Sequence, residues 1–219
     1  MPSSSLAAPR LARLVLPGNL ATTETESLQE EGQHEAERLT GADLSERGLR
    51  GLALSECEWT DVRLSGADLT AGRFADTMFT SLDAAVFTAA RSDWRDVEVA
   101  RSRLGSADLY DAQWQSVRFT DCKLGYLNLR GARLKDVVFE RCTIDELDLG
   151  GANALRVALL ETDVGTLDLT RATLQHVDLR GAELSTLVGV EHLRGAIVSE
   201  YQLQQLAGMI AQQLGIIVR

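Results

Sequence analysis

The stretch SADLYDAQWQSVRFTDCKLGYLNLRGARLK, residues 106–135, decides the fold. Every fifth residue in it, from Leu109 to Leu134, is apolar, and the same spacing holds without interruption from Leu39 to Leu184. Neither an α-helix nor a β-strand has a period of five residues. A fixed period sustained over this length is typical of a repeat architecture, in which each unit buries its apolar face by stacking on its neighbours.

A second line of residues lies two positions before the first in each group of five. It is small or apolar almost throughout, with Arg47 as the clear exception, and it contains all three cysteines, Cys57, Cys122 and Cys142. The remaining three positions are mostly charged residues, Ser, Thr or Gly. We therefore expect two residues of every five to point into a core and three to point outward.

The second line also repeats every twenty residues. Valine recurs at this spacing as Val97, Val117, Val137, Val157 and Val177. Four groups of five thus complete one turn with a roughly square cross-section, and like side chains stack directly above one another.

The two inward lines compensate each other in size, because a narrow core cannot hold two large side chains at one place. Trp94, for example, is matched with Ser92. One unit breaks this rule, since Ala152 and Ala154 are both small. We expect a local irregularity there, either a bulge that turns Leu155 inward or a small cavity.

Three segments match the pattern A(D/N)Lxx, namely GADLS at 41–45, GADLT at 66–70 and SADLY at 106–110, and GARLK at 131–135 and GAELS at 181–185 differ from it only at the D/N position. On these motifs the chain resembles the pentapeptide repeat proteins over about two-thirds of its length, and among them the quinolone-resistance and gyrase-interacting members. The resemblance implies an all-β solenoid, a right-handed quadrilateral β-helix, and the thirty units at four per coil predict about 7–8 coils. The resemblance also implies a homodimer contact through the C-terminal segment.

The repeat divides the chain into three parts. Residues 1–38 are expected to form an N-terminal arm or cap, partly irregular, with the apolar residues 14–16 covering the first coil; a solvated tail is the alternative. Residues 39–188 are the predicted β-helix. Residues 189–219 are the predicted C-terminal cap.

Ser199 and Gln202 have the spacing of a capping box, which predicts a helix from about 200 to 214. Apolar residues follow at helical spacing: Leu203, Leu206, Ile210, Leu214 and Ile217. We expect this set to plug the last coil, to form a homodimer contact as the resemblance implies, or to do both.

The composition argues against catalysis. The three histidines are scattered along the 219 residues, and none pairs with a cysteine at metal-ligand spacing. No phosphate-binding or nucleophile motif occurs in a suitable context. We therefore expect no enzymatic activity, no cofactor and no metal, and the net charge of −10 disfavours direct binding of nucleic acid.

Location is predicted from the same composition. No apolar run is long enough for a transmembrane helix, and the segment LVLPGNLA at 14–21 is a poor signal peptide because Pro17 and Gly18 break it. Three inward cysteines indicate buried free thiols in a reducing compartment. We expect a cytoplasmic protein without membrane contact.

One outward column is predicted to be acidic or amide-bearing. It consists of Asp68, Thr88, Asp108, Asn128, Asp148 and Asp168, one residue per coil. With eight acidic residues against three arginines from Asp145 to Glu183, the C-terminal half of the rod is expected to be its acidic half.

Two interpretations of this column stay open. Asp and Asn suit tight turns because they bond their own backbone. Alternatively, the resemblance implies a DNA mimic, whose acidic rod occupies the duplex-binding groove of a type II topoisomerase such as DNA gyrase. For the function of the whole protein, the alternative to mimicry is a structural or interaction scaffold with another protein partner and no effect on topoisomerases.

Overall fold

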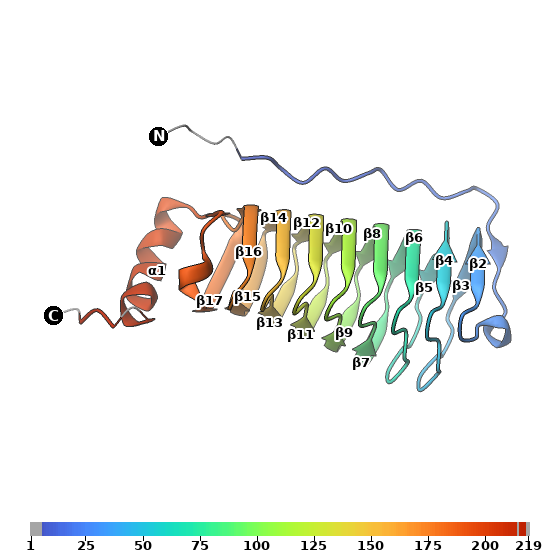
Figure 1. Ribbon diagram of the computed structural model, residues 1–219. Helices are drawn as coiled ribbons and strands as arrows, with labels where there is room; N and C mark the ends of the chain where they lie inside the picture. Colours follow the sequence, from blue (N-terminus) through green and yellow to red (C-terminus); the bar gives the residue numbers. More distant parts are fainter. Residues whose placement is uncertain (1–5, 214, 218–219) are drawn as a thin grey trace.

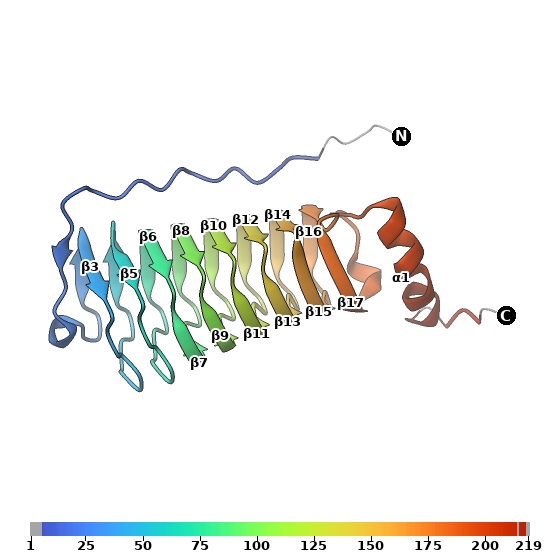
Figure 2. The same ribbon diagram turned by 180° about the vertical axis from the view of Figure 1, so that it is seen from behind.

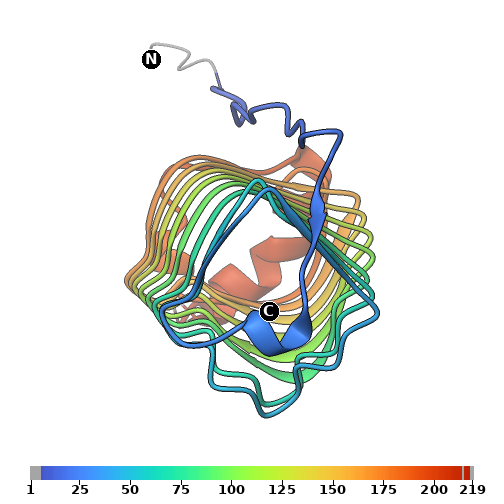
Figure 3. The same ribbon diagram turned by 90° about the vertical axis from the view of Figure 1, so that its right-hand side faces the viewer.

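The computed structural model describes residues 6–213 and 215–217. It is a solenoid of parallel β-strands with one α-helix at its C-terminal end (Figure 1). Viewed along the axis, successive turns superpose in a closed, four-sided outline (Figure 3). One turn takes twenty residues, because Gln113 pairs with Asp93 on one side and with Arg133 on the other. The predicted all-β solenoid, its C-terminal helix and the superperiod of twenty residues are confirmed.

The strands form two sheets. The 12-stranded sheet contains β1 (Ala21–Thr22), β2 (Gln33–Glu35), β3 (Glu37–Thr40), β4 (Ala53–Ser55), β5 (Glu58–Thr60), β6 (Arg73–Thr80), β8 (Asp93–Ala100), β10 (Gln113–Thr120), β12 (Arg133–Glu140), β14 (Asn153–Leu160), β16 (Thr173–Asp178) and β18 (Ala196–Ile197). The 6-stranded sheet contains β7 (Asp83–Thr88), β9 (Arg103–Asp108), β11 (Lys123–Asn128), β13 (Thr143–Asp148), β15 (Thr162–Asp168) and β17 (Ala182–Val188). The helical segments are η1 (Thr25–Ser27), η2 (Val190–His192) and α1 (Glu200–Gln213).

The core consists of the two predicted inward lines. All three tryptophans and all three cysteines are buried, and the cysteines are free thiols. Aromatic rings stack from coil to coil, as in Phe119 and Phe139, whose centroids are 5.3 Å apart with planes at 22°. Such pairs add to the stabilisation that burial alone provides.

The pairing of a large side chain in one inward line with a small one in the other also decides whether a buried tryptophan has a hydrogen-bond partner. The Trp94 indole Nε1 donates a hydrogen bond to Ser92 Oγ at 2.7 Å. One coil further on, the corresponding partner position is Ala112, and the buried Nε1 of Trp114 has no hydrogen-bond partner among the described residues. An unsatisfied buried donor lowers stability.

The predicted irregularity near Ala154 is a small cavity of about 10 Å³. Leu134 and Leu174, the neighbours of Ala154 in its column, are among the residues that line it. The alternative of a bulge is wrong. Leu155 keeps its register between Lys135 and Gln175 and lies half-buried on the outside, because the regular ladder hydrogen bonds outweigh the gain from filling so small a void.

Corner residues between the faces mostly have left-handed backbone conformations, although few of them are glycines. In one corner column φ lies between 48° and 60° from Asp76 to His176. The diagonally opposite column behaves differently. Glu46 and Gly66 are left-handed in the early turns, but from Val86 onward the chain passes this corner as continuous strand. Figure 3 shows the early turns, in blue and cyan, extending further out at one corner.

The N-terminal arm, residues 6–20, runs along the outside of the rod towards its C-terminal end (Figures 1 and 2). Its backbone donates hydrogen bonds to side chains of the corner column that runs from Asp76 to His176, which we call the first corner. The acceptors are Ser116, Asp136 and His176. The expectation that residues 14–16 cover the first coil is therefore wrong. Leu28, fully buried after η1, closes that coil instead, and strand pairing already begins at β1.

The C-terminal helix α1 begins with the predicted capping box. The Gln202 backbone N donates to Ser199 Oγ at 3.1 Å, and the Ser199 backbone N donates to Gln202 Oε1 at 2.8 Å. Gln202 and Leu206 are the buried residues of the helix, and Gln202 Nε2 donates to the carbonyls of Leu179 and Ala182.

The predicted plug set is thus only partly correct. Leu206 is buried and Ile210 is half-buried against the core, but Leu203 and Ile217 are exposed, and Leu214 lies outside the described residues. The buried stripe starts at Gln202 because the open carbonyls of the last coil need hydrogen-bond donors, which leucine does not supply.

Candidate functional site

The predicted acidic column is assembled on one face of the rod. Asn128 lies in register between Asp108 and Asp148, and Asp148 in turn pairs with Asp168. Asp68 and Thr88 continue the column towards the N-terminal end. The sequence-based placement of these residues is therefore reproduced in space.

Asp148 is the most enclosed member, with 4% of its surface exposed. Its carboxylate accepts hydrogen bonds from Tyr126 Oη at 3.1 Å, from Arg130 Nη1 at 3.0 Å and from the Gly150 backbone N at 2.8 Å. Burial and the neighbouring Asp148 carboxylate raise the pKa of Tyr126 to about 12. This carboxylate is bound within the rod and is not displayed to a partner.

The other members are held in a similar way. Asp108 Oδ1 accepts a hydrogen bond from Asn128 Nδ2 at 2.9 Å, and Asp168 Oδ1 accepts one from the Thr170 backbone N at 2.7 Å. Burial opposes ionisation of Asp68, but hydrogen bonds from Thr70 and Arg50 outweigh it and lower its pKa. These contacts are those of turn-stabilising aspartates.

Arginines interrupt the charge of this face. Arg50, Arg91, Arg130 and Arg171 belong to the same face or its adjoining corner. Arg50 and Arg130 pair with column carboxylates at 3.0 Å. The face is therefore a mixed pattern of charges and not a continuous acidic band.

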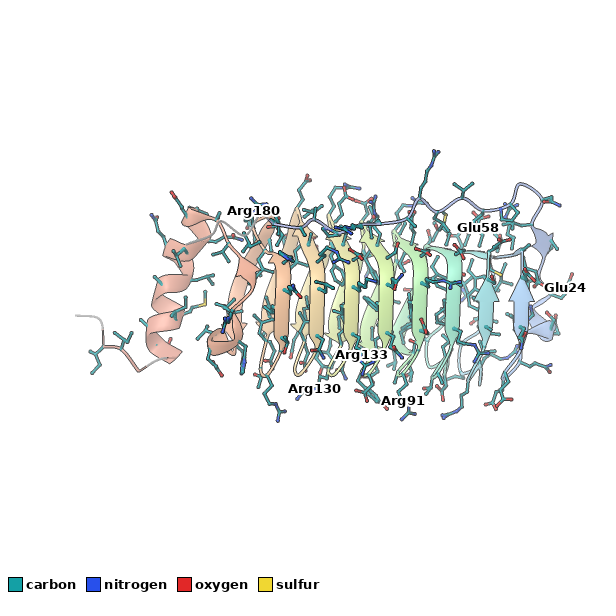
Figure 4. The ribbon with its side chains drawn as sticks, turned by 45° about the horizontal axis from the view of Figure 1, so that its top comes forward. Glu24, Glu58, Arg91, Arg130, Arg133 and Arg180 are labelled. Atoms are coloured by element: carbon teal, nitrogen blue, oxygen red, sulfur yellow. The ribbon has the colours of Figure 1, made fainter. Side chains whose placement is uncertain are left out.

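Most of the negative charge lies elsewhere. Eleven of the 32 acidic residues fall between Glu24 and Asp61, against only three arginines. These residues belong to the N-terminal end of the rod, where Glu24 and Glu58 are labelled in Figure 4. The expectation that the C-terminal half is the acidic half is wrong, because it left out the turns formed by residues 21–38.

A second polar centre, missed by the sequence analysis, lies under the N-terminal arm. Asp136 is buried at a corner and pairs with Arg156, which donates from Nε at 2.6 Å and from Nη2 at 2.7 Å. The Arg10 backbone N donates to the same carboxylate at 2.8 Å. Burial opposes ionisation of Asp136, but these hydrogen bonds hold its pKa below the usual value. The available signal was an Asp and an Arg twenty residues apart on a corner line.

Reactive chemistry has little support in the part of the chain that the structure describes. No group of three or more His, Cys, Asp or Glu side chains there could hold a metal ion. A hydrogen bond with Cys142 and burial raise the pKa of the Cys122 thiol, which keeps it protonated. Among the described helices, none is long and apolar enough to cross a membrane.

The fold and its surface define a β-solenoid whose side chains are displayed in straight columns around a filled core. A family model described as "Pentapeptide repeat region" matches residues 112–187. Together with the unbroken period of five and the twenty-residue turn, this match supports the predicted resemblance to the pentapeptide repeat proteins. No curated protein matches the sequence.

Several solved structures are similar in fold. Full-length QnrB1, described as a plasmid-mediated fluoroquinolone resistance protein, is 16% identical over 82% of this chain and 100% of its own, with a TM-score of 0.31. HetL, a protein involved in heterocyst differentiation regulation from the cyanobacterium Nostoc sp. strain PCC 7120, is 18% identical over 78% of this chain and 92% of its own, also with a TM-score of 0.31. Values this low transfer neither a partner nor an activity.

Proposed function

We propose that this protein is a non-catalytic binding rod that recognises another protein through its ordered outer faces. The observation that carries the proposal is that polar side chains on more than one outer face are already held by hydrogen bonds, as the pair of Asp136 with Arg156 and the pair of Asp108 with Asn128 illustrate. Polar side chains that are already fixed lose little conformational entropy when a partner docks. A long, rigid surface of this kind suits a large partner better than a small substrate.

A second candidate is mimicry of duplex DNA towards a type II topoisomerase such as DNA gyrase. The net charge of −10 and the acidic N-terminal end support it, since a basic groove would attract such a rod over long range. The proposed contact residues are the column Asp68, Asp108, Asn128, Asp148 and Asp168 together with that end. The internal pairing of the column makes this candidate the weaker of the two.

A supercoiling assay with purified gyrase separates the two candidates. Mimicry predicts inhibition that falls with added salt, competes with duplex DNA, and weakens in the variant Asp108→Asn/Asp168→Asn. Asp163→Asn/Glu183→Asn, which removes the same charge from the neighbouring face, is the matched control. The binding-rod proposal instead expects no effect on supercoiling at micromolar protein, and partner binding that survives the column variant.

Dimerisation through the C-terminal segment is part of the proposal. Tyr201, Leu203, Ile216 and Ile217 are large apolar residues that are exposed at this end of the rod. Exposed apolar groups gathered in this way are typical of a contact surface. Sedimentation analysis should give a dimer that Leu203→Glu dissociates and Gln204→Glu, a control on the same helix, does not; a wild-type monomer at high concentration would refute it.

A further inference from the structure

One outward face is hollowed and carries a concentration of positive charge. The N-terminal halves of β6, β8, β10 and β12 line a shallow groove of about 490 Å³. Its charged side chains are Arg73, Arg95, Arg133, Lys135 and Asp93. Arg133 is labelled on this part of the rod in Figure 4. We call this hollow the basic groove.

Most of these cations lack a carboxylate partner. Among the described residues, Arg73 and Arg133 form no ion pair, and Lys135 Nζ reaches only Gln115 Oε1, at 3.5 Å. Arg95 lies 4.0 Å from Asp76 and from Asp96. Like charges held near one another raise the free energy of the rod unless an anion binds between them.

The groove presents two parallel columns. Register places Arg73, Asp93, Gln113 and Arg133 in one column, and Ala75, Arg95, Gln115 and Lys135 in the other. Neighbouring strands are about 4.8 Å apart, so Arg73 and Arg133 are separated by roughly 14 Å. This is about the span of four residues of an extended peptide.

The N-terminal arm adds positive charge beside the groove. It is fastened at Ser116 and Asp136, the corner residues that directly follow Gln115 and Lys135. The described part of the arm contains no acidic residue, and both of its arginines, Arg10 and Arg13, are exposed. The arm therefore adds two exposed arginines next to the face that carries the groove.

We propose that the basic groove binds a short, extended, acidic peptide segment of a partner protein. Arginine and carboxylate form strong paired hydrogen bonds, and glutamates four positions apart would reach Arg73 and Arg133. This inference rests on the proposed function as a binding rod and names the chemistry of the partner on a face other than the acidic column.

Two observations favour a peptide over nucleic acid. The aromatic residues beneath the groove, Phe74, Trp94 and Trp114, are buried, so no ring is available for the stacking that single-stranded nucleic acid requires. Along the axis, acidic residues flank the groove on both sides, from Glu24 to Asp61 and from Asp145 to Glu183. A long polyanion would meet repulsion there, whereas a short segment would not.

Fluorescence anisotropy with a labelled peptide of about eight residues, bearing glutamate at every fourth position, tests the inference. The full chain should bind it in a salt-sensitive manner, and a glutamine version of the peptide should not bind. Arg73→Ala/Arg133→Ala/Lys135→Ala should weaken binding by about tenfold or more, or about 1.4 kcal/mol. The matched control, Arg101→Ala/Arg103→Ala/Lys123→Ala, removes three cations at other positions and should change binding less than about twofold.

Three results would overturn the inference: no binding of the glutamate peptide at low salt, an equal loss in both triple variants, or tighter binding of a labelled oligonucleotide through the same three residues. Circular dichroism of each variant establishes that the rod is folded. The gyrase assay tests acidic residues on another face of the rod. Failure of peptide binding would therefore contradict the role of the basic groove but not the binding-rod proposal.

Discussion

At two diagonally opposite corners of the rod, the chain passes from one face to the next with different backbone conformations. At the corner that includes Ser116 and Asp136, the backbone is left-handed and the side chains bind the N-terminal arm. At the corner ten residues further along, β7, β9, β11, β13 and β15 run through without a left-handed residue. One corner is held by side chains, whereas the other has glycine at three of its positions, Gly105, Gly125 and Gly165.

At these three glycines of the second corner the backbones of neighbouring coils approach closely. A Cβ atom on Gly105 would lie 2.6 Å from the carbonyl oxygen of Ala85, and one on Gly125 would lie 2.0 Å from that of Gly105. Gly165 is in the same position above Asp145. The comparison shows that a repeat of five residues fixes which side chains are buried but does not fix the backbone conformation at each corner.

The largest expected effect comes from crowding the second corner. Gly125→Ala places a methyl group against rigid backbone, so we expect the free energy of unfolding to fall by more than about 2 kcal/mol. The midpoint of urea-induced unfolding measures this loss. Gly151→Ala is the control, since its Cβ would meet nothing within 4 Å and only the left-handed φ of 68° opposes it, at roughly 1 kcal/mol. Equal losses would refute the role assigned to the close approach.

Breaking the first corner should be almost as costly. Asp136→Ala leaves Arg156, itself largely buried, and the Arg10 backbone N without their partner, which should cost about 2 kcal/mol. The arm should also loosen, so trypsin should cut faster after Arg10 and Arg13. Asp121→Ala breaks the exposed pair with Arg141 and should cost less than about 1 kcal/mol. Unchanged cleavage would show that the arm does not depend on Asp136.

Acid should weaken the first corner selectively. The pKa of Asp136 is lowered in the folded state, so its contribution is present above the pKa of an unfolded aspartate and is lost as the pH falls through the folded value. Between about pH 5 and about pH 2 the wild type should lose more stability than Asp136→Asn. Asp68 and Asp178 also have lowered pKa values, but they are common to both proteins and cancel in the difference. Parallel pH profiles would contradict this assignment.

Features that depend on regular spacing along the sequence were predicted, and features without such spacing were missed. The period of five and the superperiod of twenty gave the core, and the capping box of Ser199 and Gln202 gave the start of α1, because both depend on local spacing. The course of the arm could not be predicted. Residues 6–20 have no periodicity, and their contacts, such as Arg10 with Asp136, join positions 126 residues apart.

The candidate site was predicted in position but not in character. The column of Asp108 and Asp148 is where the spacing placed it, yet pairing with Arg130 depends on side-chain directions that a repeat does not specify. The signals for the other features were present as residues twenty or forty apart: Gly105, Gly125 and Gly165 at the second corner. When the sequence is written in rows of twenty residues, these glycines fall in one column.

The smallest expected effect concerns the face formed by β8 and β10, which leads to the corner beneath the N-terminal arm. Trp94 and Trp114 are neighbours in adjacent coils there, but only the indole Nε1 of Trp94 has a hydrogen-bond partner, Ser92. Ala112→Ser places a hydroxyl at the position equivalent to Ser92 and should raise the free energy of unfolding by about 1 kcal/mol. Ala132→Ser, one coil further, faces Leu134 and should be destabilising, because its hydroxyl meets no indole donor. The urea midpoints of the two variants should therefore move in opposite directions, and a shared direction would mean that the indole of Trp114 does not gain from the new acceptor.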